Sequence, residues 1–118
     1  MRSSAALGKA GEKAAAEVLR RRGYRVIGAG FRARRGELDL VCRRGDDLVV
    51  VEVKTRTTGV YGTPVEAVGS RKRQALRSAA AEYRAMTEWR GPIRYAVMGL
   101  TVNREGGFDV ELVDEPFA

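Results

Sequence analysis

Asp39, Glu52 and Lys54 are the residues whose types and spacing could do chemistry. They belong to two predicted strands around the turn signal Arg44-Gly45-Asp46-Asp47. If Gly45-Asp46 forms a two-residue hairpin loop, Asp39 lies directly opposite Glu52, and Lys54 follows on the same face. Carboxylates placed opposite each other repel and need a compensating cation. Lys54 supplies one such cation, and a divalent metal ion would supply another.

The ligand types favour a hard metal ion. The carboxylates of Asp39 and Glu52, with water and the Val53 carbonyl, suit Mg²⁺ or Mn²⁺ rather than zinc or copper. Such an ion beside an ammonium group outlines a site for phosphodiester hydrolysis, in which the metal polarises the phosphoryl oxygen and activates its bound water. Lys54 would orient that water or stabilise the charge that grows on phosphorus. Glu12, in the first predicted helix, is a candidate third carboxylate.

A structural reading of the same residues stays open. Glu-x-Lys spacing is common on strands that simply expose a solvated, salt-bridged face, and Glu12 alone reads as an ordinary exposed helix residue. The same hairpin register also predicts one entirely apolar face, on which Leu38, Leu40 and Cys42 lie opposite Val53, Val51 and Val49. A hairpin with one apolar face needs other elements to cover it.

Composition excludes several classes of enzyme. The 118-residue chain has no histidine and a single cysteine, Cys42. Histidine-based acid–base chemistry, Ser-His-Asp triads and most zinc sites are therefore excluded. A lone cysteine permits no internal disulfide and suits a reducing compartment. The sequence contains neither a signal-peptide core nor an apolar run long enough to cross a membrane, so we expect a cytoplasmic protein with no membrane partner.

The size and charge of the chain favour one globular domain with a polyanionic partner. The 118 residues are 44% hydrophobic and 31% charged, and the net charge is +7. Basic residues concentrate in segments 1–35 and 69–90, whereas segment 36–68, which holds the predicted hairpin, is acidic overall. A solvated basic surface is the alternative to nucleic-acid binding. The candidate nucleic-acid-binding residues are Arg20, Arg21, Arg22, Arg32, Arg34, Arg35, Arg56, Arg71, Lys72 and Arg73.

The predicted elements give an α/β fold. The order is helix, three strands, helix, two strands, which favours a central mixed β-sheet flanked by helices. Gly28-Ala29-Gly30 is expected to end the first strand, and the Thr63–Glu66 capping box to begin a short helix that ends at Gly69. The predicted helices are 4–22 and 70–89, and the predicted strands are 24–27, 37–42, 48–54, 93–102 and 108–113.

Two blocks, Gly-Glu-Leu-Asp-Leu at 36–40 and Val-Glu-Val-Lys at 51–54, carry a family resemblance. Together with Gly11-Glu12 and Tyr61-Gly62, they make the chain resemble the YraN-like family of small bacterial proteins over about residues 8–113. That family has a restriction-endonuclease-like fold and is related to archaeal Holliday-junction resolvases. The chain departs from the usual pattern at Gly30 and Ala96.

The resemblance implies a nuclease-type centre. In it, Asp39, Glu52 and Lys54 correspond to an acidic–acidic–lysine motif, and Glu12 corresponds to the helix carboxylate of resolvases. The implied activity is Mg²⁺- or Mn²⁺-dependent endonuclease cleavage of branched or single-stranded DNA, in repair or recombination. The alternatives are a non-catalytic DNA- or RNA-binding module on the same scaffold and an adaptor for an acidic protein partner. Resolvases act as dimers, which leaves a homodimer open, and its one sequence signal is the free edge of the last strand.

Overall fold

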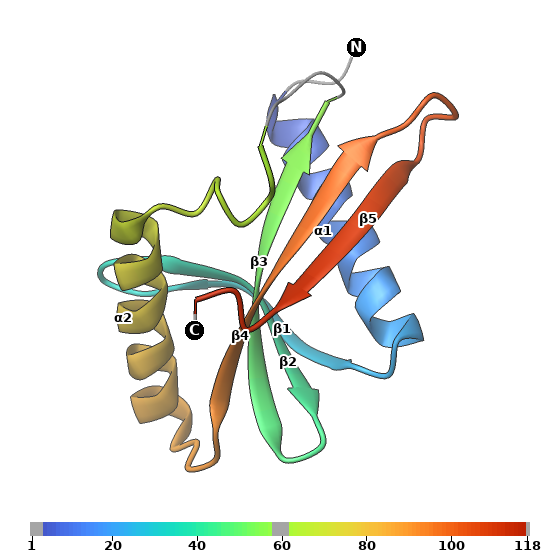
Figure 1. The fold of residues 1–118 in the computed structure, drawn as a ribbon. Helices are drawn as coiled ribbons and strands as arrows, with labels where there is room; N and C mark the ends of the chain where they lie inside the picture. The colour runs from blue at the N-terminus through green and yellow to red at the C-terminus, as the bar shows by residue number, and fades with distance from the viewer. Residues whose placement is uncertain (1–3, 58–61, 118) are drawn as a thin grey trace.

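A computed structural model describes residues 4–57 and 62–117. Two helices and five strands follow one another in the predicted order (Figure 1). Their bounds differ from the predicted ones by a few residues, except in β1. The elements are α1 Ser4–Arg21, β1 Arg25–Arg32, β2 Glu37–Arg44, β3 Asp47–Arg56, α2 Ser70–Thr87, β4 Ile93–Val102 and β5 Phe108–Asp114.

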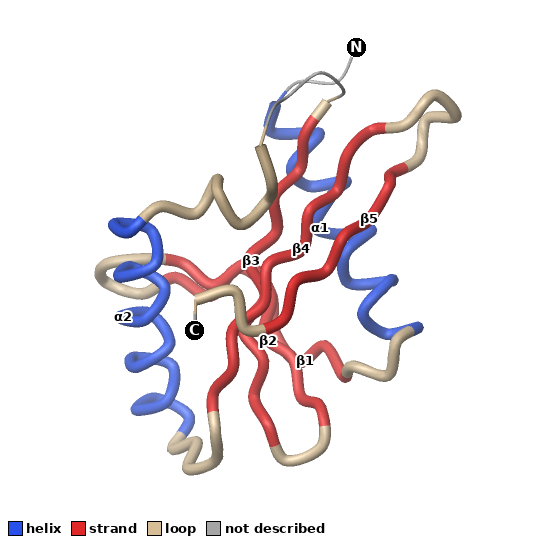
Figure 2. The backbone as a smooth tube through the Cα atoms, viewed as in Figure 1, coloured by secondary structure: helices blue, strands red, loops and turns tan. Residues whose placement is uncertain are grey.

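The strands form one mixed sheet in the order β1-β2-β3-β4-β5. β3 and β4 are parallel, because α2 carries the chain from the end of one strand back to the start of the other, and the remaining neighbours are antiparallel. Figure 2 shows α2 and α1 on opposite sides of this sheet. The predicted α/β class and mixed sheet are confirmed, and the architecture is consistent with a restriction-endonuclease-like fold. β5 is an edge strand, as expected.

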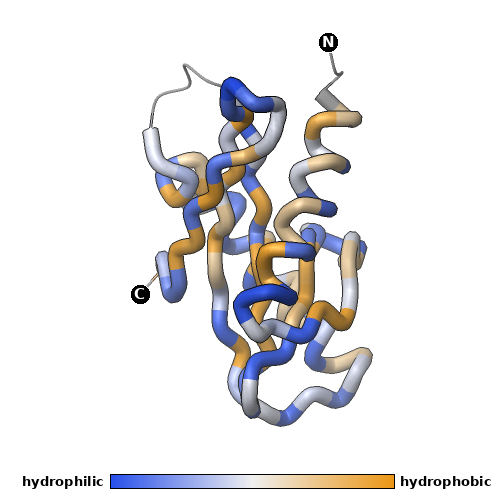
Figure 3. The backbone as a smooth tube through the Cα atoms, turned by 90° about the vertical axis from the view of Figure 1, so that its right-hand side faces the viewer, coloured by the Kyte–Doolittle hydropathy of each residue, from blue (hydrophilic) through white to orange (hydrophobic). Residues whose placement is uncertain are grey.

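Each face of the sheet buries its own core. On one side, Ala15 and Leu19 of α1 pack against Leu40, Val51 and other residues of the central strands. On the other side, Leu76 and Ala79 of α2 pack with Val41, Val50 and Val97. Apolar and polar residues alternate along the turns of α1, as an amphipathic helix requires (Figure 3). Within the described ranges, no helix has the length and hydropathy to cross a membrane.

The hairpin register is confirmed near the turn. Leu40 pairs with Val51, Val41 with Val50 and Cys42 with Val49. The prediction that Leu38 shares the face of Leu40 and Cys42 is wrong, because Leu38 packs in the core on the α2 side. The reason lies in the ladder, whose paired residues end at Leu40 and Val51. Beyond that point β2 no longer follows the regular alternation that the prediction assumed.

The glycines at 28–30 do not break the first strand. β1 continues through them to Arg32, and its register against β2 shifts between Val26 and Gly28. This β-bulge absorbs one extra residue, and Gly30 takes the left-handed conformation with φ of 65°. Glycine adopts that conformation at little cost, so the segment bends without leaving the sheet.

The predicted short helix at 63–69 is also wrong. The capping hydrogen bond forms, since the Glu66 N–H donates to Thr63 Oγ1 at 3.2 Å, and the Val68 N–H donates to the Val65 carbonyl. The chain then becomes extended at Gly69, directly before α2. One hydrogen-bonded turn is the costly nucleus of a helix, and no further residues are available here to repay that cost.

Candidate active site

Asp39 lies where the β2–β3 ladder ends. Its Oδ2 accepts a hydrogen bond of 2.9 Å from the backbone N–H of Val53, two residues beyond the last pair, Leu40 and Val51. The carboxylate thus occupies a place that a backbone carbonyl would take in an uninterrupted ladder. A charge-assisted bond from a rigid strand fixes its position. The diverging strands therefore hold Asp39 against β3.

Glu52 is a buried charged residue from the adjacent strand. Only 3% of its surface is exposed. Its Oε1 lies 3.7 Å from Nζ of Lys54, on the same strand, and 3.5 Å from Nζ of Lys72, on α2. Its Oε2 is buried and has no hydrogen-bond partner among the residues that the structure describes. A buried oxygen in that state costs free energy unless a proton or a cation joins it.

Burial and Asp39 raise the pKa of Glu52 to about 7. Burial is the larger cause and the negative charge of Asp39 the next, while the ammonium groups of Lys72 and Lys54 act in the opposite direction. When protonated, Glu52 hydrogen-bonds to Asp39; when ionised, its Oε2 has no donor. The structure therefore brings Asp39, Glu52 and Lys54 together, in a state that either a proton or a cation relieves.

Glu12 faces the same centre from α1. It lines an open pocket of about 520 Å³ with Asp39 and Lys54. Burial raises the pKa of Glu12, and the negative charges of Asp39 and Glu37 raise it further. Within residues 4–57 and 62–117, no three acidic, histidine or cysteine side chains form a ready-made ligand set. The charge of Asp39 thus acts on Glu12, but the two carboxylates are not part of a three-residue set of metal ligands.

A hard cation fits the donor set at the end of the ladder. Asp39 and the unpartnered Oε2 of Glu52 supply carboxylate oxygens, and the Val53 carbonyl is adjacent in the chain. These are oxygen ligands of the kind that Mg²⁺ and Mn²⁺ prefer, with water filling the remaining positions. Nitrogen and sulfur ligands are lacking here, since the chain has no histidine and Cys42 is buried in the core on the α1 side.

The close approach of α1 to β3 positions Glu12. Gly11 is buried against Thr55, and a side-chain carbon at that position would overlap the Thr55 hydroxyl. Only glycine lets α1 come this near to the Thr55 side chain, so Glu12 follows at the edge of the pocket. The Gly11-Glu12 pair of the sequence therefore has a steric explanation.

The basic residues predicted to bind nucleic acid do not form one cluster. Lys72 is at the site itself, in an ion pair with Glu52. Arg56 donates to the Gly62 carbonyl at 2.7 Å, and the guanidinium of Arg73 lies over the Phe117 ring at 5.7 Å. These contacts use side chains that the sequence suggested were free for phosphate. Arg71 is exposed on the first turn of α2.

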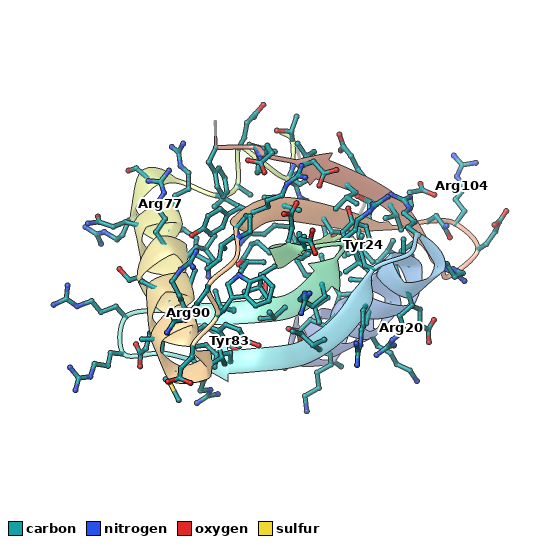
Figure 4. All side chains as sticks on the ribbon, turned by 90° about the horizontal axis from the view of Figure 1, so that it is seen from below. Arg20, Tyr24, Arg77, Tyr83, Arg90 and Arg104 are labelled. Atoms are coloured by element: carbon teal, nitrogen blue, oxygen red, sulfur yellow. The ribbon has the colours of Figure 1, made fainter. Side chains whose placement is uncertain are left out.

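The remaining arginines lie on two separate surfaces. The β1–β2 hairpin tip reaches α2, where the Arg34 N–H donates to Glu82, so that Arg32, Arg34 and Arg35 lie near that helix. Arg20, Arg21 and Arg22 follow at the other end of α1, and Arg20 is about 12 Å along the helix axis from Glu12. Figure 4 shows Arg20 and Arg77 on opposite sides of the molecule. The cluster of residues 20–22 therefore does not flank the acidic site directly.

Sequence reasoning did not assign Lys72 to the acidic centre. It placed Lys72 among the phosphate-binding residues, whereas the structure pairs its ammonium with Glu52. The available signal was that Glu52 shares a strand face with Val50, which packs toward α2, so that a lysine in the first turn of α2 could reach it. That signal becomes useful only once the docking of α2 is known.

Comparison with known proteins places the chain in a bacterial family. The model of the uncharacterised protein family UPF0102 matches residues 11–111. A UPF0102 protein of Syntrophomonas wolfei is 49% identical over 77 residues, covering 65% of this chain and 67% of that relative. One of Anaeromyxobacter dehalogenans is 49% identical over 78 residues, covering 66% of this chain and 58% of its own length.

The likeness also extends over nearly the whole chain. UPF0102 protein STH1475 of Symbiobacterium thermophilum is 41% identical over 112 residues, which is 94% of this chain and 95% of the relative. Both the extent of the family match and this full-length relative support the YraN-like assignment made from the paired sequence blocks. The chain belongs to the uncharacterised protein family UPF0102.

Proposed function

We propose that this protein is a metal-dependent endonuclease that hydrolyses phosphodiester bonds in DNA of branched or single-stranded structure. The observation that carries the proposal is the buried Glu52 carboxylate, which interacts with Asp39 and has one oxygen near two ammonium groups and the other without a partner among the described residues. A buried carboxylate whose pKa is strongly raised, next to a pocket that Asp39 and Lys54 line, is typical of a functional site. The basic charge of the chain suits a polyanionic substrate.

Each residue has a distinct role in this proposal. Asp39 and Glu52 hold Mg²⁺ or Mn²⁺ with the Val53 carbonyl, and the bound ion supplies Lewis-acid activation of the phosphoryl group and of water. Lys54, 27% exposed in its side chain, lies between the buried Glu52 and the pocket. Its ammonium orients the attacking water and stabilises the negative charge of the pentacovalent phosphorus. Glu12 lines the pocket from α1, and its carboxylate accepts hydrogen bonds from water there without binding the metal.

A non-catalytic nucleic-acid-binding module is the second candidate. The observation that favours it is the neutralisation of Glu52 by Lys54 and Lys72 within the protein, which a purely structural ion-pair triad would also show. Such a module would bind DNA or RNA in a salt-sensitive manner without a metal requirement and without cleavage. An adaptor for an acidic protein partner would have negligible affinity for nucleic acid at physiological salt.

Cleavage assays separate these candidates. Branched, single-stranded and duplex DNA are incubated with the protein and Mg²⁺ or Mn²⁺, and with the variants Asp39→Asn and Lys54→Met. We expect cleavage by the wild type and a loss of about 100-fold or more in each variant, since each removes a group that acts on the reacting phosphate. Asp114→Asn, an exposed aspartate at the end of β5, is the matched control and keeps full activity. Cleavage that survives unchanged in both site variants would assign the activity to another site.

A further inference from the structure

Lys72 differs from Lys54 in how it approaches Glu52. Lys54 is fixed two residues along the same strand, whereas Lys72 comes from the first turn of α2. Both ammonium groups address the same oxygen, Oε1, at 3.7 Å and 3.5 Å. The side chain of Lys72 is 41% exposed, against 27% for Lys54. Lys72 is thus the more exposed cation of the two, with a path into solvent.

A divalent ion at Asp39 and Glu52 would change the electrostatic interaction of the Lys72 ammonium with the site. Without the ion, the buried Glu52 needs a counter-charge, and Lys72 supplies it together with Lys54. With the ion bound, Glu52 is neutralised and the ammonium of Lys72 faces a like charge at short range. The flexible four-carbon stem of lysine lets the ammonium leave without moving the helix. Lys54 lines the pocket and its side chain is the less exposed of the two, at 27%, so we expect its ammonium to stay beside the site.

The residues around Lys72 form a basic surface on which its released ammonium would meet a phosphate. Its neighbour Arg71 is exposed on the same turn of α2, and the hairpin tip with Arg34 lies along that helix. The neighbouring Arg73 is turned toward Phe117 instead. A phosphate approaching the site on the α2 side would therefore meet Arg71 and, once it is free, Lys72.

We infer that Lys72 is an exchangeable internal counter-ion: it holds Glu52 in the metal-free protein, is displaced by the divalent ion, and then binds a phosphate of the nucleic acid. This inference rests on the proposed function. It makes Lys72 a residue whose side chain couples the binding of metal to the binding of nucleic acid. Because such coupling is reciprocal, nucleic acid would also raise the affinity for the metal.

Metal titration of Lys72→Met tests this exchange. Mn²⁺ binding is measured by calorimetry at pH 8, without nucleic acid, for the wild type, Lys72→Met and Arg71→Met. Removal of the competing cation should make Lys72→Met bind Mn²⁺ about tenfold more tightly than the wild type. Arg71→Met loses the same charge from the same turn without touching Glu52, and should stay within about twofold of the wild type. Lys72→Gln, which keeps a polar side chain, should behave like Lys72→Met.

The second readout is nucleic-acid binding with and without the ion. Fluorescence anisotropy with a single-stranded oligonucleotide, in Ca²⁺ to avoid cleavage, should show that the ion raises wild-type affinity by about fivefold or more. Lys72→Met should show a smaller gain, whereas Arg71→Met should keep the wild-type gain and lose affinity in both conditions.

The outcomes separate this inference from the proposed function. Equal Mn²⁺ affinities for Lys72→Met and Arg71→Met, in a wild type that binds Mn²⁺ and cleaves DNA, would overturn the exchange and leave the nuclease proposal standing. A wild type that binds no Mn²⁺ and cleaves no DNA would overturn both. Circular dichroism of each variant identifies any that fails to fold, and Lys72→Gln then decides the result.

Discussion

At the scale of single residues, the candidate site brings together charged groups whose burial costs free energy when no ligand is bound. Glu52 is buried, its Oε2 has no partner among the described residues, and Asp39 adds a second negative charge beside it. Replacing such groups with apolar residues often stabilises a fold. Retaining them next to a pocket that Asp39 lines is typical of a site whose cost is offset by function.

Glu52 should make the stability of the metal-free protein fall as the pH rises. Its pKa is about 7 in the folded protein against an ordinary value of 4.5. The folded state therefore holds the proton more tightly. The stabilisation is complete below about pH 4.5 and is lost as the pH rises through about 7, by about 3 kcal/mol in total. Urea unfolding at pH 5 and pH 8 in EDTA measures this change.

Glu52→Gln isolates the contribution of that carboxyl. The amide carries no charge at either pH, so this part of the pH dependence should disappear. At pH 8 the variant should exceed the wild type by roughly 1–3 kcal/mol in its free energy of unfolding, while losing metal binding. Glu111→Gln, on the exposed side of β5, serves as the control. If the free energy of unfolding of the variant keeps the wild-type pH dependence, Glu52 does not titrate between pH 5 and pH 8 in the folded state.

The sequence predicted the acidic pair and its lysine but not their second cation. The two-residue turn fixes the register as far as Leu40 and Val51, and counting one residue further placed Asp39 beside Glu52. The ladder has ended at that point, but the two carboxyl groups are still close enough to interact. The hydrogen bond from Val53 to Asp39 and the ion pair of Lys72 could not be predicted in this way. Both depend on where strands separate and where a helix docks, which are tertiary features.

At the scale of elements, the site exists because a helix and a strand approach each other closely. Gly11 of α1 faces Thr55 of β3 with no room for a side-chain carbon. The same contact sets the height of Glu12 above the pocket that Asp39 and Lys54 line. The position of α1 is therefore coupled to the geometry of the site.

Two glycine substitutions in α1 should have opposite effects. Gly11→Ala should destabilise the protein by roughly 1–3 kcal/mol, because the added methyl group overlaps Thr55 and must push the helix from the sheet. Gly8→Ala should stabilise it by roughly 0.5–1 kcal/mol, because nothing lies within 4 Å of the new carbon and alanine favours the helix. Thermal or urea unfolding of both variants measures the difference. Equal stabilities would contradict the close packing of α1 on β3.

Prediction of the elements succeeded where periodicity is strong and failed where glycine and caps were ambiguous. The paired strands β2 and β3 follow the turn and the apolar pattern. The Gly28-Ala29-Gly30 segment was predicted to be a break, yet cross-strand pairing continues β1 through it with a bulge. The capping box at Thr63 formed its hydrogen bond but had too few residues after it for a helix. Local signals identify both features without deciding whether the neighbouring sheet or helix overrides them.

At the scale of the whole molecule, the two helices lie on opposite faces of the sheet, and both contribute a side chain to the candidate site. Glu12 of α1 reaches the pocket from one side, and Lys72 of α2 reaches Glu52 from the other. The net charge of +7 is distributed over both helical surfaces, with Arg20 and Arg77 far apart (Figure 4). Under the proposed function, we expect a nucleic acid at the site to contact the α2 side without reaching residues 20–22. Binding by the arginines of α1 would need a longer or a bent substrate.

The central claim is that Asp39 and Glu52 jointly bind a hard divalent ion, and anomalous scattering tests it most directly. Diffraction data from a crystal soaked in Mn²⁺ at pH 8 should show an anomalous peak between the Asp39 Oδ and Glu52 Oε atoms, with the Val53 carbonyl nearby, and Lys72 withdrawn from Glu52. An anomalous map with no peak between these carboxylates, or with peaks only at exposed acids such as Glu111 and Asp114, would contradict the claim. The buried carboxylates would then be a structural ion-pair cluster.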